Sequence, residues 1–222
     1  MKLYPCFTHW LNNSTVQNAI WLFSDPHFGD EEMQSLRTYR ISDEELIKRI
    51  NSKVGKHDTV ICLGDVGDVS YVQKIKGYKV LILGNHDQGA SNFQRIETFV
   101  KPEEITDTTR MSYIEAHYRK MYYPETGTYY YHDNKLFDEV YEGSLQIAPK
   151  IILSHEPVDY KYCFNIHGHD HNGSPRENHL NLCVELIDYT PVNLNSIVNS
   201  GMLKNIPDVH RDTIDRATNK TQ

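Results

Sequence analysis

Three short apolar runs, each followed at once by Gly or Asp, mark the first half of the chain. They are residues 19–24, 58–63 and 78–83, and all three are rich in Ile, Val and Leu. Runs of this length and composition are typical of buried strands that end in a loop. The pattern therefore predicts three buried strands.

Two helical segments separate these runs. Ser42 is followed by three acidic residues and by apolar residues at helical spacing as far as Val54, which predicts an N-capped amphipathic helix. Residues 69–75 predict a shorter helix. Strands that alternate with helices form right-handed β-α-β units and a parallel sheet. Ligands of such sheets bind beyond the carboxyl ends of the strands, where polar residues follow all three runs.

The rest of the chain has a less regular pattern. Two antiparallel hairpins are expected, one pairing residues 3–11 with 15–20 and one pairing residues 137–141 with 145–153. Further helices are predicted at residues 92–100 and 194–198, and further strands at residues 164–166 and 179–187. We expect a single domain, residues 1–222, with a core at about 20–200, a Tyr-rich insertion near the site mouth at about 101–135, and a polar appendage at 201–222.

Length and composition add limits to this picture. A chain of 222 residues buries roughly 70% of the surface that its unfolded form exposes. The formal charge of −7 argues against a broad surface that follows nucleic-acid phosphates, although bound cations would reverse the potential locally. The sequence shows neither a secretory leader nor a membrane span, so we expect a cytoplasmic protein. Four scattered cysteines are expected to be reduced core thiols: Cys6, Cys62, Cys163 and Cys183.

Residues with metal-binding side chains follow successive apolar runs. They stand in five short motifs: SDPH with Asp25 and His27, LGD with Asp65, GNHD with Asn85 and His86, SHEP with His155, and GHDH with His169 and His171. Strands that end at one edge of a sheet would bring these carboxylate, amide and imidazole groups together. The order of the motifs predicts a phosphoesterase that holds two divalent cations.

Each motif also has an ordinary structural explanation when it is taken alone. A D-x-H sequence is common by chance. Asp65 would serve as a helix N-cap, Asn85 would begin an Asx-turn, and a lone histidine such as His155 is more often a packing residue. Three imidazoles within residues 167–171 have little structural use and favour a metal. Together, the motifs favour a metal centre.

The order D-x-H, G-D, G-N-H-D, H and G-H-x-H over residues 20–190 resembles the calcineurin-like metallophosphoesterase superfamily. The motif sequences SDPHFG, LILGNHD, LSHEP and NIHGHDH, with YTPV at residues 189–192, resemble those of small bacterial and phage phosphoesterases of unassigned substrate. The resemblance implies an α/β fold, a sandwich of two mixed β-sheets flanked by helices, with a dimetal site at the C-terminal ends of strands.

The resemblance also implies roles for the motif residues. The metal ligands form two sets joined by one bridging carboxylate: Asp25, His27 and His171 for the first metal, Asn85, His155 and His169 for the second, and Asp65 between them. His86 would stay free of metal, and we expect it to act as a general acid or to stabilise the transition state. Asp87 is expected to orient the His86 imidazole. His167 would be a supporting residue.

In such sites two divalent cations lie about 3.5–4 Å apart and bind the phosphate oxygens. They also share a hydroxide, which would attack phosphorus in line. Mixed nitrogen and oxygen donors suit Mn²⁺, our first expectation, and also Fe, Zn²⁺, Co²⁺ or Ni²⁺. The absence of cysteine from every motif disfavours a structural zinc site.

The motifs narrow the choice of phosphoester. Protein phosphatases of this superfamily carry an Asp-Arg-Gly motif where this chain has GDVGD, so the arginine that grips a monoester dianion is missing. Related lipid-pathway pyrophosphatases have arginine where His86 stands, and repair nucleases carry further capping domains. We expect a small-molecule or nucleotide-like phosphodiester as substrate. Nuclease or phosphomonoesterase activity, and a noncatalytic metal-binding scaffold, are the alternatives. Arg37 and Arg40 are expected to be exposed residues beside a helix, with contacts to the substrate phosphate as the alternative.

Overall fold

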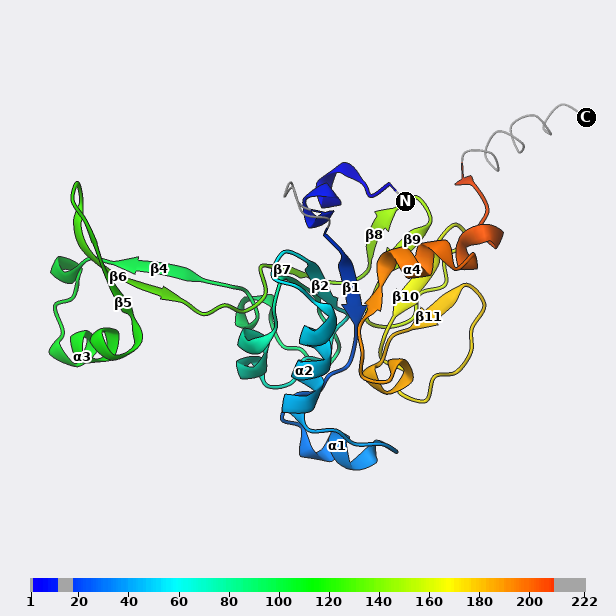
Figure 1. Cartoon of the computed structure of the whole chain (residues 1–222), viewed down its shortest axis with the longest axis horizontal. Helices are drawn as coiled ribbons and strands as arrows, with labels where there is room; N and C mark the ends of the chain where they lie inside the picture. Colours follow the sequence, from blue (N-terminus) through cyan, green and yellow to red (C-terminus); the bar gives the residue numbers. More distant parts are fainter. Residues whose placement is uncertain (1, 12–17, 210–222) are drawn as a thin grey trace, which may run out of the picture.

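Two mixed β-sheets form the body of the molecule (Figure 1), and the computed structural model describes residues 2–11 and 18–209. The first sheet has the strand order β12-β1-β2-β3-β7, and the second has the order β11-β10-β9-β8. The strands of the first sheet are β1 Ile20–Phe23, β2 Thr59–Cys62, β3 Tyr78–Ile82, β7 Glu139–Tyr141 and β12 Val192–Asn193. Those of the second are β8 Leu145–Ala148, β9 Ile151–Leu153, β10 Phe164–His167 and β11 His179–Asn181.

Parallel pairing dominates both sheets, which sets the position of the loops. Strands β1, β2, β3 and β7 are parallel, and only β12 runs against them in the first sheet. Strands β9, β10 and β11 are parallel in the second sheet, with β8 antiparallel at its edge. The carboxyl ends of parallel strands share one edge of a sheet, so the loops after β1, β2 and β3 lie together.

Apolar side chains cover both faces of the first sheet. Alternate residues along a strand point to opposite faces, and one set joins the core between the two sheets: Leu22, Ile61, Val80 and Ile82, with Ile147, Leu153 and Ile166. The other set forms a second core beneath helix α2: Phe23, Val60, Cys62 and Leu81, with Leu46, Ile50 and Val72. A sandwich of two mixed sheets flanked by helices is therefore confirmed.

Helices connect the strands. Helix α2, Asp43–Lys53, begins where the sequence predicts, because Ser42 Oγ accepts a hydrogen bond from the Glu45 backbone N–H at 3.2 Å. Helix α1, Glu31–Leu36, follows the first motif, and α4, Leu194–Asn199, packs beside β1. The structure also contains 3₁₀ helices: η1 Pro5–Leu11, η2 Val69–Lys74, η3 Ala90–Asn92, η4 Pro102–Glu104, η5 Val184–Ile187 and η6 Met202–Asn205.

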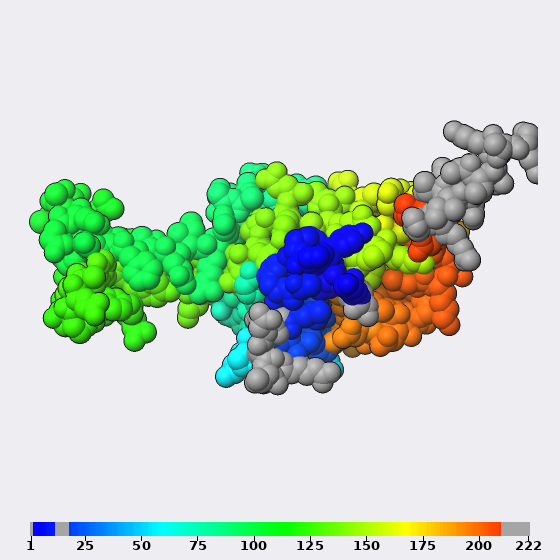
Figure 2. All heavy atoms as spheres, turned by 90° about the horizontal axis from the view of Figure 1, so that it is seen from above, coloured from blue at the N-terminus to red at the C-terminus, as the bar shows by residue number. Residues whose placement is uncertain are grey.

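A third, antiparallel sheet is inserted between β3 and β7 and stands away from the body (Figure 1). It consists of β4 Glu97–Val100, β5 Arg119–Tyr123 and β6 Gly127–Asp133, with helix α3 Thr108–His117 against it. Val100, Ile114 and Tyr130 form its small core. Figure 2 shows this insertion as a separate lobe joined to the body by a narrower stretch.

The N-terminal 3₁₀ helix η1 is held to the first sheet through Glu139 of β7. The Glu139 carboxylate accepts hydrogen bonds from Trp10 Nε1 at 3.1 Å, Tyr78 Oη at 2.7 Å and Tyr141 Oη at 2.5 Å. His9 Nε2 lies 2.5 Å from the same carboxylate. Burial raises the pKa of Glu139, but these hydrogen bonds outweigh it and leave the pKa below its ordinary value.

Several elements differ from the sequence predictions. Residues 5–11 form a 3₁₀ helix, not a hairpin strand, because Phe7 and Trp10, three residues apart, both reach the core; residues 15–17 of the expected partner strand lie outside the described residues. Residues 97–100 form strand β4 where a helix was predicted, since they pair with β6. Strand β7 pairs with β3, not with residues 145–153, which divide into β8 and β9. The strand predicted at 179–187 ends at Asn181.

The structure also tests two simpler expectations. The four cysteines are free, but Cys6 is exposed, so it is not a core thiol. No helix within residues 2–11 and 18–209 is long and apolar enough to cross a membrane.

Candidate functional site

The predicted ligands stand in loops at the carboxyl ends of five strands. Asp25 and His27 follow β1, Asp65 follows β2 and Asn85 follows β3. His155 follows β9, and His169 and His171 follow β10. The fold thus brings together residues that are up to 146 positions apart, from Asp25 to His171.

The first cluster consists of Asp25, His27 and His171, whose nearest ligand atoms all lie within 4.8 Å of one another. His171 Nε2 lies 3.6 Å from Asp25 Oδ1. Asp25 and His27 are buried, yet Asp25 Oδ1 and His27 Nε2 have no hydrogen-bond partner in the structure. Buried polar atoms are costly unless they are paired. A cation shared by these side chains would satisfy both atoms, so the residues present fit a metal ion.

The second cluster consists of Asp65, His155 and His169, and Asn85 joins it. Asn85 Oδ1 lies 2.8 Å from His155 Nε2 and 3.0 Å from His169 Nδ1, and the two ring nitrogens are 3.2 Å apart. His155 Nδ1 lies 2.8 Å from the Leu63 carbonyl oxygen. Because that oxygen only accepts, Nδ1 carries the proton and leaves the Nε2 lone pair for a cation.

Asp65 lies between the two clusters. Its Oδ2 is 3.6 Å from His27 Nε2 and 3.4 Å from His155 Nε2. Its Oδ1 accepts a hydrogen bond from the His86 backbone N–H at 3.0 Å. One carboxylate oxygen therefore faces both sets of imidazoles, which suits a ligand shared by two cations.

Left-handed backbone conformations are concentrated in these loops. Asp25, His27, Asp65 and His169 have φ values of 56°, 46°, 53° and 68°. This region costs roughly 1–2 kcal/mol for a residue with a Cβ, and such strain is typical of functional sites. Gly84 is required for a different reason, because a Cβ there would lie 2.1 Å from Asp65 Oδ1.

The electrostatic surroundings differ between the histidines. Burial lowers the pKa of His27, although the nearby Asp65 and Asp25 carboxylates oppose this effect. A lowered pKa favours the neutral imidazole, which is the form that binds a metal. His171 Nδ1 lies 3.1 Å from Glu185 Oε1, and this hydrogen bond raises the pKa of His171. Glu185 thereby orients the ring so that Nε2 faces Asp25.

Two residues at the site, Glu185 and Cys183, were not identified from the sequence as site residues, and for a third, Arg37, a phosphate contact was only the alternative to an exposed position. Glu185 contacts His171, and Cys183 Sγ lies 3.3 Å from Asp25 Oδ2, which brings a cysteine to the site although no motif contains one. Arg37 was expected to be exposed, which is wrong: it is buried and donates to the Asp25 carbonyl at 2.8 Å and to Glu185 at 2.5 Å. No local pattern marks Cys183 and Glu185, because η5 and its N-cap, which follow β11, set their position.

Asp87 does not orient the His86 imidazole, so that expectation is wrong. Its carboxylate accepts hydrogen bonds from the backbone N–H groups of Gly84 at 2.8 Å, Asp65 at 2.9 Å and Val66 at 3.0 Å. Asp87 therefore joins the loop after β2 to the loop after β3. The His86 side chain is exposed, with its ring 5.6 Å from the ring of His27.

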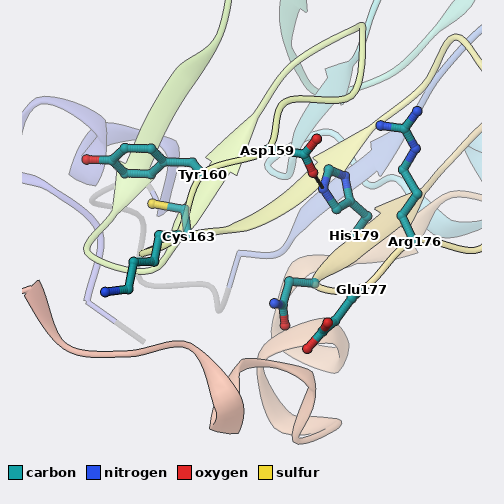
Figure 3. Close-up of a pocket in the computed structure, with 8 residues that line it drawn as sticks. Asp159, Tyr160, Cys163, Arg176, Glu177 and His179 are labelled. Carbon is teal, nitrogen blue, oxygen red and sulfur yellow. Dashed lines mark hydrogen bonds and ion pairs between the residues drawn. The ribbon is translucent and has the colours of Figure 1, made fainter.

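His167 is buried at the end of β10. Its Nδ1 lies 2.8 Å from the Gly168 carbonyl oxygen, and its ring is 5.3 Å from the ring of His179. Burial lowers the pKa of His167. Figure 3 shows the neighbouring cavity, in which His179 pairs with Asp159 at 3.0 Å. None of the candidate metal ligands lines this cavity, which has a volume of about 630 Å³.

Comparisons with known proteins show what the chain is similar to. Residues 19–193 match the model of the calcineurin-like phosphoesterase family. The chain is 38% identical to the Gene 66 protein of Mycobacterium phage L5 over 80 residues, which cover 30% of this chain and 39% of that protein. The chain therefore spans well under half of the length of this relative.

A solved structure shows the same fold. It is that of a protein of unknown function from Aquifex aeolicus, which superposes with a TM-score of 0.55 at 20% identity, over 82% of this chain and 99% of the other. At this identity the similarity concerns the fold alone. The family match spans most of the chain and includes every candidate ligand. The chain belongs to the calcineurin-like phosphoesterase family, whose members bind divalent metals.

Proposed function

We propose that this protein is a dinuclear-metal phosphodiesterase. The observation that carries the proposal is the position of Asp65 Oδ2, which lies 3.6 Å from His27 and 3.4 Å from His155, one residue of each cluster. In this proposal Asp25, His27 and His171 hold one cation, and Asn85, His155 and His169 hold the other. Asp65 is shared between them.

Mn²⁺ is the cation that we propose, with Fe, Zn²⁺, Co²⁺ and Ni²⁺ as alternatives, because the ligands mix nitrogen and oxygen donors. When bound, two such cations polarise phosphate oxygens and lower the pKa of water toward neutrality. The chain contributes the orientation of its ligands. Leu63 sets the tautomer of His155, and Glu185 sets that of His171.

His86 is proposed as the general acid or as a donor to the phosphate oxygens in the transition state. Its backbone N–H is anchored to Asp65, while its exposed ring lies beside His27. In the imidazolium form it would protonate the leaving alkoxide, a contribution of roughly 10²–10⁴ in rate.

A monoanionic diester fits the arrangement of cationic side chains better than a dianionic monoester. Arg37, which contacts the first cluster, spends donors on the Asp25 and Pro26 carbonyls and pairs with Glu185. Its charge is thus balanced by Glu185 within the protein, and one buried nitrogen, Arg37 Nη1, has no hydrogen-bond partner in the structure. Phosphomonoesterase or nuclease activity at the same site remains the alternative function.

Hydrolysis of bis(4-nitrophenyl) phosphate by protein stripped of metal and reloaded with Mn²⁺ tests the proposal. We expect His86→Ala to retain two Mn²⁺ ions per chain while turnover falls by roughly 10²–10⁴. His117→Ala, a change at an exposed histidine of α3, is the matched control and should keep the wild-type rate. Absence of turnover in the wild type with two ions bound would refute the proposal. A panel of a monoester, a cyclic nucleotide and single-stranded DNA would then separate the alternative activities from a noncatalytic scaffold.

A further inference from the structure

A cavity of about 970 Å³ opens beside the first cluster. Helix α1 and the loop that follows it form one wall of the cavity, and η5 and the loop that follows it form another. We name it the side pocket, and its lining residues include Met33, Leu36, Tyr39, His171, Leu186 and Tyr189. His171 belongs both to the side pocket and to the first cluster. A phosphate bound at the first cluster would therefore direct one of its ester groups into the side pocket.

Most of the apolar side chains that line the side pocket lie outside the cores, although Tyr189 belongs to the core beneath helix α2. Helix α1 buries none of its residues, yet Met33 and Leu36, three positions apart on one helix face, both line the cavity. Leu36, Tyr39 and Leu186 are 71%, 60% and 43% exposed. Large apolar side chains that gather around a concave surface are typical of a ligand site. α1 lies at the end of the body toward which β1 points (Figure 1), so the apolar wall is on the side of the candidate ligands.

The charges of the wall disfavour a second phosphate. Among the described residues that line the side pocket, Arg37 is the one Lys or Arg, and its charge is balanced by Glu185 at 2.5 Å. Asp188 adds a second carboxylate to the wall, and it is paired at 3.3 Å with Arg49, which is not a lining residue. A polyphosphate chain would therefore meet side-chain charges that are already paired within the protein, whereas a neutral group would meet apolar surface.

We propose that the side pocket binds one ester group of the substrate, and that this group is a neutral, planar aromatic ring. This inference rests on the proposed phosphodiesterase function, because the phosphate anchors the substrate at the metals. Tyr39 offers an exposed ring for stacking, and the volume of the cavity suits a group as large as a nucleobase. A simple aryl ester and a nucleoside share this chemistry.

Binding measurements on the Mn²⁺-loaded protein test the inference without relying on turnover. Isothermal titration compares diphenyl phosphate and thymidine 5′-methylphosphate with dimethyl phosphate, which lacks a ring. We expect at least one aromatic ligand to bind roughly tenfold more tightly than dimethyl phosphate, and Leu36→Ser combined with Tyr39→Ala to remove most of that ratio. Tighter binding of the thymidine ester would identify a nucleoside group, and tighter binding of diphenyl phosphate a simple aryl group.

The variant Ile96→Ser is the matched control, because Ile96 is also an exposed apolar residue, at 53%, but lies outside the side pocket. It should keep the wild-type ratio. Equal binding of all three ligands to the wild type, or an unchanged ratio in the double variant, would overturn the inference. Parallel turnover of bis(4-nitrophenyl) phosphate separates the two proposals. Turnover with an unchanged ratio would refute the side pocket alone, whereas ring-dependent binding without turnover would refute only the proposed function.

Discussion

Asp87→Asn tests whether one carboxylate holds the two loops that carry Asp65 and Asn85. In the structure Asp87 Oδ2 accepts from the Gly84 and Asp65 backbone N–H groups, and Oδ1 accepts from Val66. Asparagine keeps a single acceptor oxygen and places an NH₂ group where the other oxygen stood. At least one backbone N–H must then face another donor.

The magnitude follows from these contacts. A buried N–H that loses its acceptor costs about 1–3 kcal/mol. The hydrogen bonds that remain weaken as well, because bonds to a carboxylate are roughly twice as strong as neutral ones. The combined loss is about 2–4 kcal/mol, a large share of the roughly 5–15 kcal/mol that stabilises most domains. For a chain of this size it corresponds to a fall in Tm of roughly 4–16 °C.

Thermal unfolding of the metal-free protein, followed by circular dichroism, measures this loss. Asp68→Asn is the control, because the exposed Asp68 caps η2 through one bond to the Ser70 N–H at 2.8 Å. Asparagine caps a helix as well as aspartate does, so the control should stay within about 0.5 kcal/mol of the wild type. We also expect Asp87→Asn to weaken Mn²⁺ binding, because Asp65 and Asn85 then lose their fixed separation.

An unchanged Tm together with lost turnover would refute this reasoning. That combination would mean that Asp87 acts on the His86 imidazole, as the sequence suggested, and not on the two loops.

Three further predictions address other parts of the molecule. Glu185→Gln removes the negative charge that faces both Arg37 and His171. Mn²⁺ affinity at one of the two sites should therefore fall roughly 10–100-fold in calorimetry, and equal affinity would exclude a positioning role. Burial raises the pKa of Glu139, but its hydrogen bonds lower it by more, so the folded pKa lies below the unfolded value of about 4.3. The ionised carboxylate therefore stabilises the fold above the unfolded pKa, and this stabilisation is lost as pH falls through the folded pKa. Glu139→Gln should therefore be less stable at pH 7 and show a shallower loss of stability between about pH 5 and 3, and parallel curves would contradict this. Mn²⁺ at about 100 times its Kd should stabilise the stripped protein by about 2.7 kcal/mol, and Asp65→Asn should abolish most of the resulting shift in Tm.

The sequence alone was sufficient for the central strands and for the residues that could act as ligands. Residues 20–23, 59–62 and 78–82 are predominantly apolar runs with Gly or Asp close behind, and such runs form strands wherever they are buried on both faces. The Ser42 cap is equally local, because the group that it satisfies lies three residues away. The motif residues were recognised for the same reason, since each belongs to a short segment with its own pattern.

Tertiary structure alone decided the partners of these residues. Residues 97–100 became a strand because β6 pairs with them, and β7 joined β3 because the chain changes sheets before β8. Arg37 reaches Glu185 across 148 positions, and the Asp87 carboxylate reaches back to the loop of Asp65. A hydrophobic pattern reports which face of an element is buried, but not which element covers it. Sheet order and loop direction set those contacts, and they depend on how the whole core packs.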